Sequence, residues 1–579
     1  MILKKIECIF LILWGCLLMA CHSAVAPRQQ VENEQDQTAP MEFPAAIARS
    51  DAASYYYFSL AQMKIKSGDI SEAKWYLEKA AQLDRGSNAV KMELARINLM
   101  SNDTEEALAL LQEVLADRPD HDEALTMAGR IYQNKKMLTE AKAMYEKALA
   151  ANPSDPNIFL YLGRIYWNER DLANAERIFR LMVNAFPASY AAHFFSGKVL
   201  ADQGKYDEAV NAFKSSLELE PSLEEARFEL IQIYRKQNKS EEVAKSYKSI
   251  LEYNPDNIKA SFELAVHYKE MNQEKRGIPF LVDLGWRSQN DNSILTFVYE
   301  NYLETKQYET AAWLLENMLK GAPQSSEIHY LSGVTFDGLK RTEKALAHLE
   351  QVKPESRFYN NAVVHRAVLL HDKGEIEQAI RIVLGAIETD PENPDYYLYL
   401  GSFYEELERY DEAIEILEKG LEIDSNNARI QFRLGVVYDK IGRRKRALEV
   451  MEKVVQIEPN NAKALNYLGY TYAEMGIELE KAEALILRAL EIKPEDGYII
   501  DSLAWVYFKQ GAFDQALLWL KKAITLVPDD PTILEHIGDV YQALNKKSLA
   551  LKYYQRSMQI KSEDREDLKK KIRVLNGGP

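Results

Sequence analysis

Residues 395–423 read DYYLYLGSFYEELERYDEAIEILEKGLEI, and this stretch decides the fold of the chain. Two sets of apolar or small residues recur in it at the three- and four-residue spacing of one helix face: Tyr397, Leu400, Gly401 and Tyr404, then Ala413, Leu417, Gly420 and Leu421. The stretch therefore predicts two amphipathic helices joined by a short turn.

The same pattern returns along the chain with a period of 34 residues. Five prolines keep this spacing: Pro119, Pro153, Pro187, Pro221 and Pro255. A glycine stands at the eighth place of many repeats: Gly129, Gly163, Gly197, Gly333, Gly401, Gly435, Gly469 and Gly538. An alanine stands at the twentieth place: Ala73, Ala107, Ala141, Ala175, Ala209, Ala311, Ala345, Ala379, Ala413, Ala447, Ala482, Ala516 and Ala550. Small residues at these two places predict a close approach of the two helices within each repeat.

This pattern resembles the tetratricopeptide repeat, a helix–turn–helix unit of 34 residues. The resemblance covers residues 52–562 in 15 repeats. It implies an all-α fold, a right-handed superhelical solenoid of about 15 tetratricopeptide helix-turn-helix repeats, in which each repeat packs on its neighbours. It also implies that the ninth residue of each first helix lies on the concave surface.

The repeats are not uniform along the chain. We predict two well-formed blocks, residues 52–257 and 358–562, separated by an irregular segment at 258–357. In that segment Gly277 and Pro279 stand where a helix interior is expected and Pro354 comes early, which would weaken the helices locally. The segment is either a flexing point or a drifted stretch that still packs. Residues 563–579 are predicted to be a capping helix and tail, because the end of a solenoid needs a polar cap.

The N-terminal residues have the features of a secretion signal. Residues 1–21 read MILKKIECIFLILWGCLLMAC, where two lysines precede an apolar stretch too short to span a bilayer. The final LMAC resembles the bacterial lipoprotein box, which implies that residues 1–20 are removed and that Cys21 is lipidated. The alternative is an ordinary signal peptide or a buried helix with a chance cysteine.

The residues after Cys21 bear on its location. Among such lipoproteins, an aspartate after the cysteine implies retention at the inner membrane, so His22 implies the outer membrane, facing the periplasm. Residues 21–51 contain too few apolar side chains to offset the entropy of chain ordering, and we expect the lipidated cysteine to be followed by a disordered tether.

Composition and motifs exclude several classes of function. A formal net charge of −16 would repel a phosphate backbone, so we expect no nucleic-acid binding. The three cysteines all lie in the first 21 residues, which leaves no thiolate for a metal site elsewhere. The sequence contains no HExxH, GxSxG, GxxxxGK[ST] or GxGxxG motif. His365 and His371 point about 120° apart on a helix and cannot jointly bind a metal. We therefore expect no enzyme activity, cofactor or metal.

Candidate binding residues come from the ninth and fifth places of the first helices. Four consecutive ninth places are basic: Arg96, Arg130, Arg164 and Lys198. Fifth places in the first half are mostly apolar: Phe58, Met92, Leu160, Phe194, Phe228 and Phe262. Together they would form a groove for an extended peptide with acidic side chains or a C-terminal carboxylate, since arginine binds carboxylates through paired hydrogen bonds. The candidate partner-binding residues are thus Arg96, Arg130, Arg164, Lys198, Phe194 and Phe228.

A second interpretation of the same residues stays open. Four nearby glutamates could neutralise the bases internally, in which case the aromatic residues belong to the core: Glu93, Glu123, Glu225 and Glu229. In the second half, valine, tyrosine and tryptophan at the ninth place suggest a drier groove.

These features lead to two hypotheses of function. The first is a membrane-anchored scaffold that binds proteins or peptides during assembly or localisation of a bacterial envelope machine for secretion, pilus formation or polysaccharide export. The second is a periplasmic lipoprotein that binds an anionic glycan or an acidic peptide in its concave groove.

Overall fold

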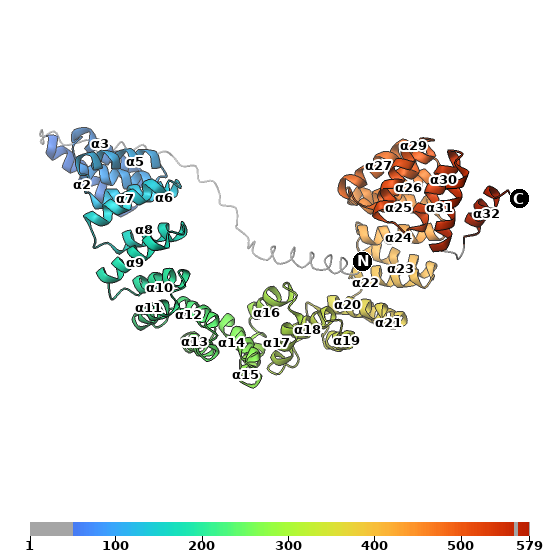
Figure 1. The fold of residues 1–579 in the computed structure, drawn as a ribbon, viewed down its shortest axis with the longest axis horizontal. Coiled ribbons are helices and arrows are strands. Elements are labelled where there is room, and N and C mark those ends of the chain that lie inside the picture. Colours follow the sequence, from blue (N-terminus) through green and yellow to red (C-terminus); the bar gives the residue numbers. More distant parts are fainter. Residues whose placement is uncertain (1–49, 561–564, 578–579) are drawn as a thin grey trace. The chain divides into compact units, whose positions relative to one another are not determined.

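The computed structural model describes residues 50–560 and 565–577, which form a succession of helices joined by short turns (Figure 1). The chain divides into two compact units. Unit 1 ends at Pro221 and unit 2 begins at Ser222. The predicted signal peptide, Cys21 and most of the tether lie outside the described residues. The predicted block boundaries at 257 and 357 stay predictions.

Unit 1 consists of five helix hairpins. Its helices are α2 (Ser50–Ser67), α3 (Ile70–Leu83), α4 (Asn88–Met100), α5 (Thr104–Asp117), α6 (Asp122–Asn134), α7 (Leu138–Ala151), α8 (Pro156–Asn168), α9 (Leu172–Ala185), α10 (Tyr190–Asp202) and α11 (Tyr206–Leu219). The two helices of each hairpin pack on each other, and each hairpin packs on the next.

Unit 2 consists of ten further hairpins and a final helix. The helices of its first five hairpins are α12 (Glu224–Lys236), α13 (Ser240–Tyr253), α14 (Ile258–Glu270), α15 (Glu274–Arg287), α16 (Asn292–Val298) with the π-helix η1 (Tyr299–Leu303), α17 (Tyr308–Met318), α18 (Ser326–Gly338), α19 (Thr342–Glu350), α20 (Tyr359–Asp372) and α21 (Ile376–Thr389). The remaining helices are α22 (Pro394–Glu406), α23 (Tyr410–Ile423), α24 (Ala428–Lys440), α25 (Arg444–Ile457), α26 (Ala462–Met475), α27 (Leu479–Ile492), α28 (Gly497–Lys509), α29 (Phe513–Leu526), α30 (Pro531–Ala543), α31 (Lys547–Ile560) and α32 (Glu566–Leu575).

The fifteen hairpins confirm the predicted all-α repeat fold, and no strand occurs within residues 50–560 or 565–577. Local chemistry sets the helix boundaries. First helices often begin at a side chain that caps free backbone N–H groups; Asp155, for example, accepts a 2.9 Å hydrogen bond from the Asn157 N–H. The turn inside a hairpin places one residue in the left-handed region, as at Gly204 with φ +77°.

The core of each unit lies between the two helices of a hairpin and between neighbouring hairpins. Every alanine predicted at the twentieth place has 0% exposed surface, which confirms close helix packing there. Glycine at the eighth place makes room for a large side chain of the second helix: a Cβ built on Gly163 would lie 2.5 Å from Phe179 Cζ.

The irregular segment of unit 2 keeps its helices. α15 continues through Pro279, which stands inside the helix and leaves out one backbone hydrogen bond of its second turn without ending it. α19 is short and ends before Pro354, so that α20 begins only at Tyr359. The π-helical turn η1 replaces the last turn of the first helix in this repeat. Whether the segment flexes stays a prediction.

Candidate interaction surfaces

Unit 1 presents a row of basic side chains on its first helices, at the ninth place of consecutive repeats. We call Arg96 on α4, Arg130 on α6, Arg164 on α8 and Lys198 on α10 the basic ladder. Arg130 and Arg164 are exposed, and neither makes a hydrogen bond or ion pair with any residue in the described part of the chain. Their guanidinium groups are therefore available to a ligand.

Arg96 differs from the next two members of the ladder because it is already paired. One of its terminal nitrogens contacts the Glu93 carboxylate and the other contacts Glu123. Burial alone would lower the pKa of Arg96, but these two carboxylates raise it above its usual value. Internal neutralisation by glutamate, which the sequence left open, thus occurs at Arg96.

Lys198 lies against aromatic rings. Its Nζ is 5.3 Å from the centre of the Trp167 ring and 5.8 Å from that of Phe194. Both distances fall within the range of a cation–π interaction, which holds the lysine stem beside the rings. Phe194 in turn packs edge-to-face on Phe195 and Phe213, with ring centres 5.4 and 5.7 Å apart.

The apolar residues at the fifth places of the first helices lie only partly at the surface. Met92 and Phe262 are buried in the core, whereas Phe58, Leu160, Phe194 and Phe228 keep part of their surface exposed. Phe228 belongs to unit 2, where its ring packs on Tyr247 at 6.3 Å and lies 4.9 Å from the Lys259 Nζ. Of the two aromatic binding candidates, Phe194 thus shares its unit with the basic ladder, and Phe228 is described with unit 2 alone.

In unit 2 the ninth-place residue Trp505 has more polar neighbours than its residue type suggests. Trp505 stacks on His536 with ring centres 4.0 Å apart, and His536 Nδ1 lies 2.9 Å from the Asp501 carboxylate. Burial would lower the pKa of His536, but Asp501 raises it overall, so the imidazole binds its second proton more readily. The Trp505 indole N–H donates to Glu474.

The last hairpin has acidic side chains at both the fifth and ninth places, Glu535 and Asp539, and these bind the final helix. Lys571 of α32 lies 3.0 Å from Glu535 and 2.6 Å from Asp539. Arg565 contacts Glu535 as well. The sequence analysis did not predict this contact, although two acidic residues at groove positions of the last repeat indicate a basic partner.

The two histidines that the sequence analysis considered as metal ligands each contact a carboxylate. His365 Nε2 lies 3.0 Å from Asp337, and His371 Nε2 lies 2.7 Å from Glu406. In residues 50–560 and 565–577, no three histidine, cysteine, aspartate or glutamate side chains gather in a way that could hold a metal ion. No helix in this part of the chain combines the length and apolarity that a membrane crossing requires.

Comparison with protein-family models assigns most of these hairpins to one repeat type. Models described as tetratricopeptide repeats match residues 64–131, 370–434, 404–454, 126–191, 180–224, 194–258 and 531–564, and a TPR repeat model matches 505–545. Together these matches cover more than half of the chain.

One curated protein is similar to a short stretch of the chain. The anaphase-promoting complex subunit CDC16 of Saccharomyces cerevisiae is 32% identical over 83 residues, which is 13% of this chain and 10% of that protein. The chain thus matches about a tenth of the length of this curated relative.

Three solved structures illustrate the range of structural likeness. The APC/C hetero-tetramer Cut9-Hcn1 is 15% identical over 79% of this chain and 90% of that chain, with a TM-score of 0.34. Naa15/Naa10 bound to HypK-THB is 14% identical over 90% and 96%, with a TM-score of 0.37. YrrB, described as a TPR protein with an unusual peptide-binding site, is 26% identical over 34% and 97%, with a TM-score of 0.29. At these TM-scores the assignment depends on the family models.

Proposed function

The chain belongs to the tetratricopeptide repeat family and is a protein-interaction scaffold, and from this premise we propose that it is tethered to a bacterial membrane and helps to assemble or position an envelope machine. Secretion, pilus and polysaccharide-export systems are machines of this kind. The observation that carries the binding role is the pair Arg130 and Arg164, which are exposed and unpaired among the described residues at the same place of consecutive first helices.

The ladder indicates what kind of partner this scaffold binds. A free guanidinium binds a carboxylate through two parallel hydrogen bonds, which gives both strength and orientation. Lys198 adds a cation held against the Trp167 and Phe194 rings, so that an apolar side chain could pack next to an acidic one. The partner segment we propose is therefore an extended acidic peptide, or a C-terminal segment ending in its carboxylate.

Attachment to the membrane rests on the sequence before the repeats. The LMAC box predicts that Cys21 carries the lipid, and His22 favours the outer membrane with the repeats in the periplasm. Lipidation of one cysteine with more than one acyl chain gives stable anchoring, since a single chain binds membranes only marginally.

Binding of an anionic glycan is the second candidate. The observation that favours it is the Trp167 ring beside Lys198, because an aromatic face next to a cation suits an acidic sugar. A pulldown with immobilised anionic glycan separates this candidate from peptide binding.

Capture from membrane extracts tests the scaffold role. Tagged mature protein is purified from envelope extracts, and copurifying proteins are identified by mass spectrometry. The double variant Arg130→Glu with Arg164→Glu should lose the principal partner. The control is Arg85→Glu with Arg180→Glu, which changes the net charge equally at two exposed arginines of unit 1 that lie off the ladder. Equal loss in both variants would contradict a specific ladder contact.

A further inference from the structure

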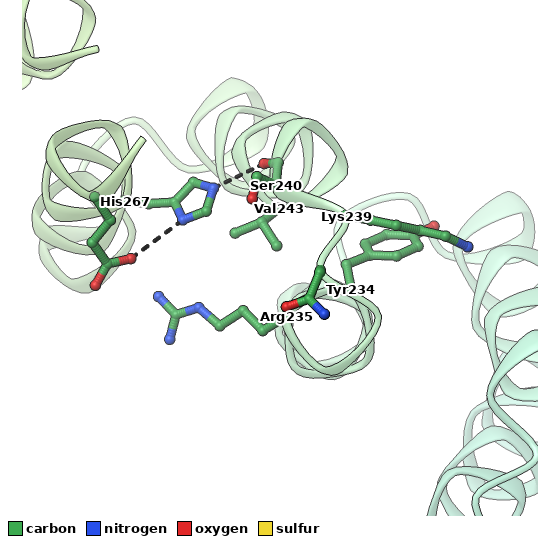
Figure 2. Close-up of a pocket in the computed structure, with 8 residues that line it drawn as sticks. Tyr234, Arg235, Lys239, Ser240, Val243 and His267 are labelled. Atoms are coloured by element: carbon green, nitrogen blue, oxygen red, sulfur yellow. Dashed lines mark hydrogen bonds and ion pairs between the residues drawn. The ribbon is translucent and has the colours of Figure 1, made fainter. Parts of the chain in front are cut away.

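Unit 2 contains a small polar pocket where the α12–α13 turn meets the end of α14 (Figure 2). The pocket has a volume of about 280 Å³. Its functional groups come from Arg235 at the end of α12, from Ser240 and Val243 at the start of α13, and from His267 and Glu270 on α14. Pockets for complete drug-sized ligands begin at about 300 Å³, so this volume suits a single side chain.

His267 places an unused hydrogen-bond acceptor in this pocket. The side chain is 5% exposed, and its Nε2 lies 2.8 Å from the Ser240 carbonyl oxygen. Because a carbonyl can only accept, Nε2 carries the proton of the neutral ring, and Nδ1 keeps a lone pair. Nδ1 is buried and has no hydrogen-bond partner among the described residues. A buried polar atom without a partner is costly, which points to a ligand that supplies one.

Glu270 supplies a second acceptor next to the first. Its Oε2 lies 3.6 Å from His267 Nδ1, which is close enough for an ion pair with a protonated ring but too long for a hydrogen bond. With the ring neutral, the two atoms are acceptors that cannot bond to each other. A donor group placed between them would bond to both.

Arg235 supplies hydrogen-bond donors on the other side of the pocket. Figure 2 shows the Arg235 guanidinium and the His267 ring facing one open region, whereas the Lys239 side chain extends away from them. One terminal nitrogen of Arg235 donates to Glu263 at 2.9 Å. A guanidinium has five N–H donors, so the others can serve an acceptor group of a ligand.

These three groups exclude several ligand classes. A carboxylate or phosphate would accept from Arg235 but would face the Nδ1 lone pair and the Glu270 charge. An ammonium or guanidinium would satisfy His267 and Glu270 but has no acceptor for the remaining N–H groups of Arg235. A primary carboxamide has two N–H donors and one carbonyl acceptor in a single plane, and it satisfies both sides.

We propose that this pocket binds the carboxamide side chain of a glutamine or asparagine of a partner protein. Its NH2 group donates to His267 Nδ1 and Glu270, its carbonyl accepts from Arg235, and its methylene carbons lie against Val243. The proposal rests on the scaffold role only in assigning the amide to a partner protein. It is independent of the basic ladder, because the pocket lies entirely within unit 2.

The test uses small probes of nearly equal size and the complete protein with 15N-labelled histidine. Propionamide represents the side-chain amide, propionate the anion, propylammonium the cation and N-methylacetamide the peptide backbone. The 15N resonance of His267 Nδ1, assigned by its loss in His267→Gln, reports hydrogen bonding at the atom that the proposal concerns. Only propionamide should shift this resonance with a saturating titration curve.

Two variants keep the result independent of folding. Glu270 is exposed, so Glu270→Ala should leave the fold intact, and it should weaken propionamide binding about fivefold because one acceptor is removed. The control Glu274→Ala on neighbouring α15, outside the pocket lining, should bind like the wild type.

Several outcomes overturn the proposal. A protonated Nδ1 in the free protein would mean that Glu270 already satisfies it. If propionate or propylammonium bound saturably and as tightly as propionamide, the pocket would be a simple charge site. Binding of N-methylacetamide alone would make it a site for the peptide backbone. No saturation by propionamide up to the limit of its solubility would leave the pocket without this ligand. None of these outcomes affects capture of partners through Arg130 and Arg164, so failure of the pocket is distinguishable from failure of the scaffold role.

Discussion

Gly285 on α15 and Met318 on α17 bring two helices of unit 2 into backbone contact. A Cβ built on Gly285 would lie 2.0 Å from the Met318 carbonyl oxygen. Gly321 contributes to the same contact, because its Cβ would lie 1.9 Å from the Val282 carbonyl oxygen. No side chain can rotate away to relieve such an overlap, so any larger residue at Gly285 must push the helices apart.

Gly285→Ala should therefore destabilise unit 2. Overpacking of a tight core costs about 1–3 kcal/mol, and we expect the upper part of that range because the clash is with backbone. The measurement is urea unfolding followed by circular dichroism.

Gly385 provides a matched control for this substitution. It is an exposed residue inside α21, and a Cβ built on it would meet nothing within 4 Å. Gly385→Ala should therefore stabilise the protein by roughly 0.5–1 kcal/mol, because alanine is the better helix former. If both variants were stabilised, the close approach at Gly285 would be wrong.

Repetition explains which close contacts the sequence predicted. Gly163 and its counterparts recur at the eighth place, so their small size signals a packing constraint, and the contact with Phe179 confirms it. Gly285 occurs once, and nothing in a single sequence separates it from a weak helix position. The π-helical turn at Tyr299–Leu303 was unpredictable for the same reason.

The candidate surfaces were predictable only in part. The 34-residue period was enough to place Arg130 and Arg164 on consecutive first helices. It could not decide that Arg96 pairs with Glu93 and Glu123 while Arg130 and Arg164 have no such partner among the described residues, because that depends on side-chain conformation. The pocket at His267 depends on a carbonyl in another helix, Ser240, and no local pattern marks such a contact.

Acidification should loosen the hairpin formed by α18 and α19. His329 and His348 face each other there with their Nδ1 atoms 3.1 Å apart, and His329 Nε2 lies 3.1 Å from the Pro323 carbonyl oxygen. Burial lowers the pKa of both imidazoles, and the nearby His329 lowers that of His348 further. Glu316 and Lys344, which pair with each other at 2.9 Å, are the charged groups that also act on His348.

The direction of the effect follows from proton binding. Both folded-state pKa values lie below the unfolded value of about 6.5, so the unfolded state binds more protons as the pH falls through that value. The stability that the two neutral imidazoles contribute at neutral pH is therefore lost on acidification. Hydrogen exchange of α18 and α19, corrected for its intrinsic pH dependence, should speed up between pH 7.5 and 5.5, and His348→Gln should reduce this change.

α30 offers an internal comparison for the same experiment. The pKa of His536 is lowered by burial but raised overall by Asp501, so its contribution to stability is fully present below the unfolded value and is lost as the pH rises through the folded value. The protection of α30 amides against hydrogen exchange should therefore stay the same or increase on acidification. Equal loosening of α18 and α30 would point to general acid unfolding and against a role for the His329–His348 pair.

Cys21→Ala should release the protein from the membrane fraction, because the thiol that would carry the lipid is gone. Labelling with a radioactive or clickable fatty acid should be lost in the same variant. Cys16→Ala is the matched control, since Cys16 lies within the predicted signal peptide and should leave both labelling and sedimentation unchanged. Continued labelling of Cys21→Ala would show that the lipid is attached elsewhere.

The members of the basic ladder should contribute unequally to partner binding. Arg130 and Arg164 are unpaired among the described residues, and each charge-assisted hydrogen bond to a partner carboxylate contributes roughly 1.5–3 kcal/mol. Reversing both charges should therefore weaken binding by at least about two powers of ten. Arg96→Gln should have a much smaller effect, because Glu93 and Glu123 already occupy that guanidinium.

Affinity for the copurified partner, measured by isothermal titration calorimetry, decides between these expectations, with thermal unfolding run in parallel. Wild-type binding should also weaken as salt rises from about 0.05 to 0.5 M, since the Debye length contracts around exposed charges. Arg130→Glu with Arg164→Glu should keep the wild-type melting temperature, because neither side chain contacts another described residue through a hydrogen bond or ion pair. A fall of several degrees would make both arginines structural, and normal binding at a normal melting temperature would make the ladder irrelevant to the partner.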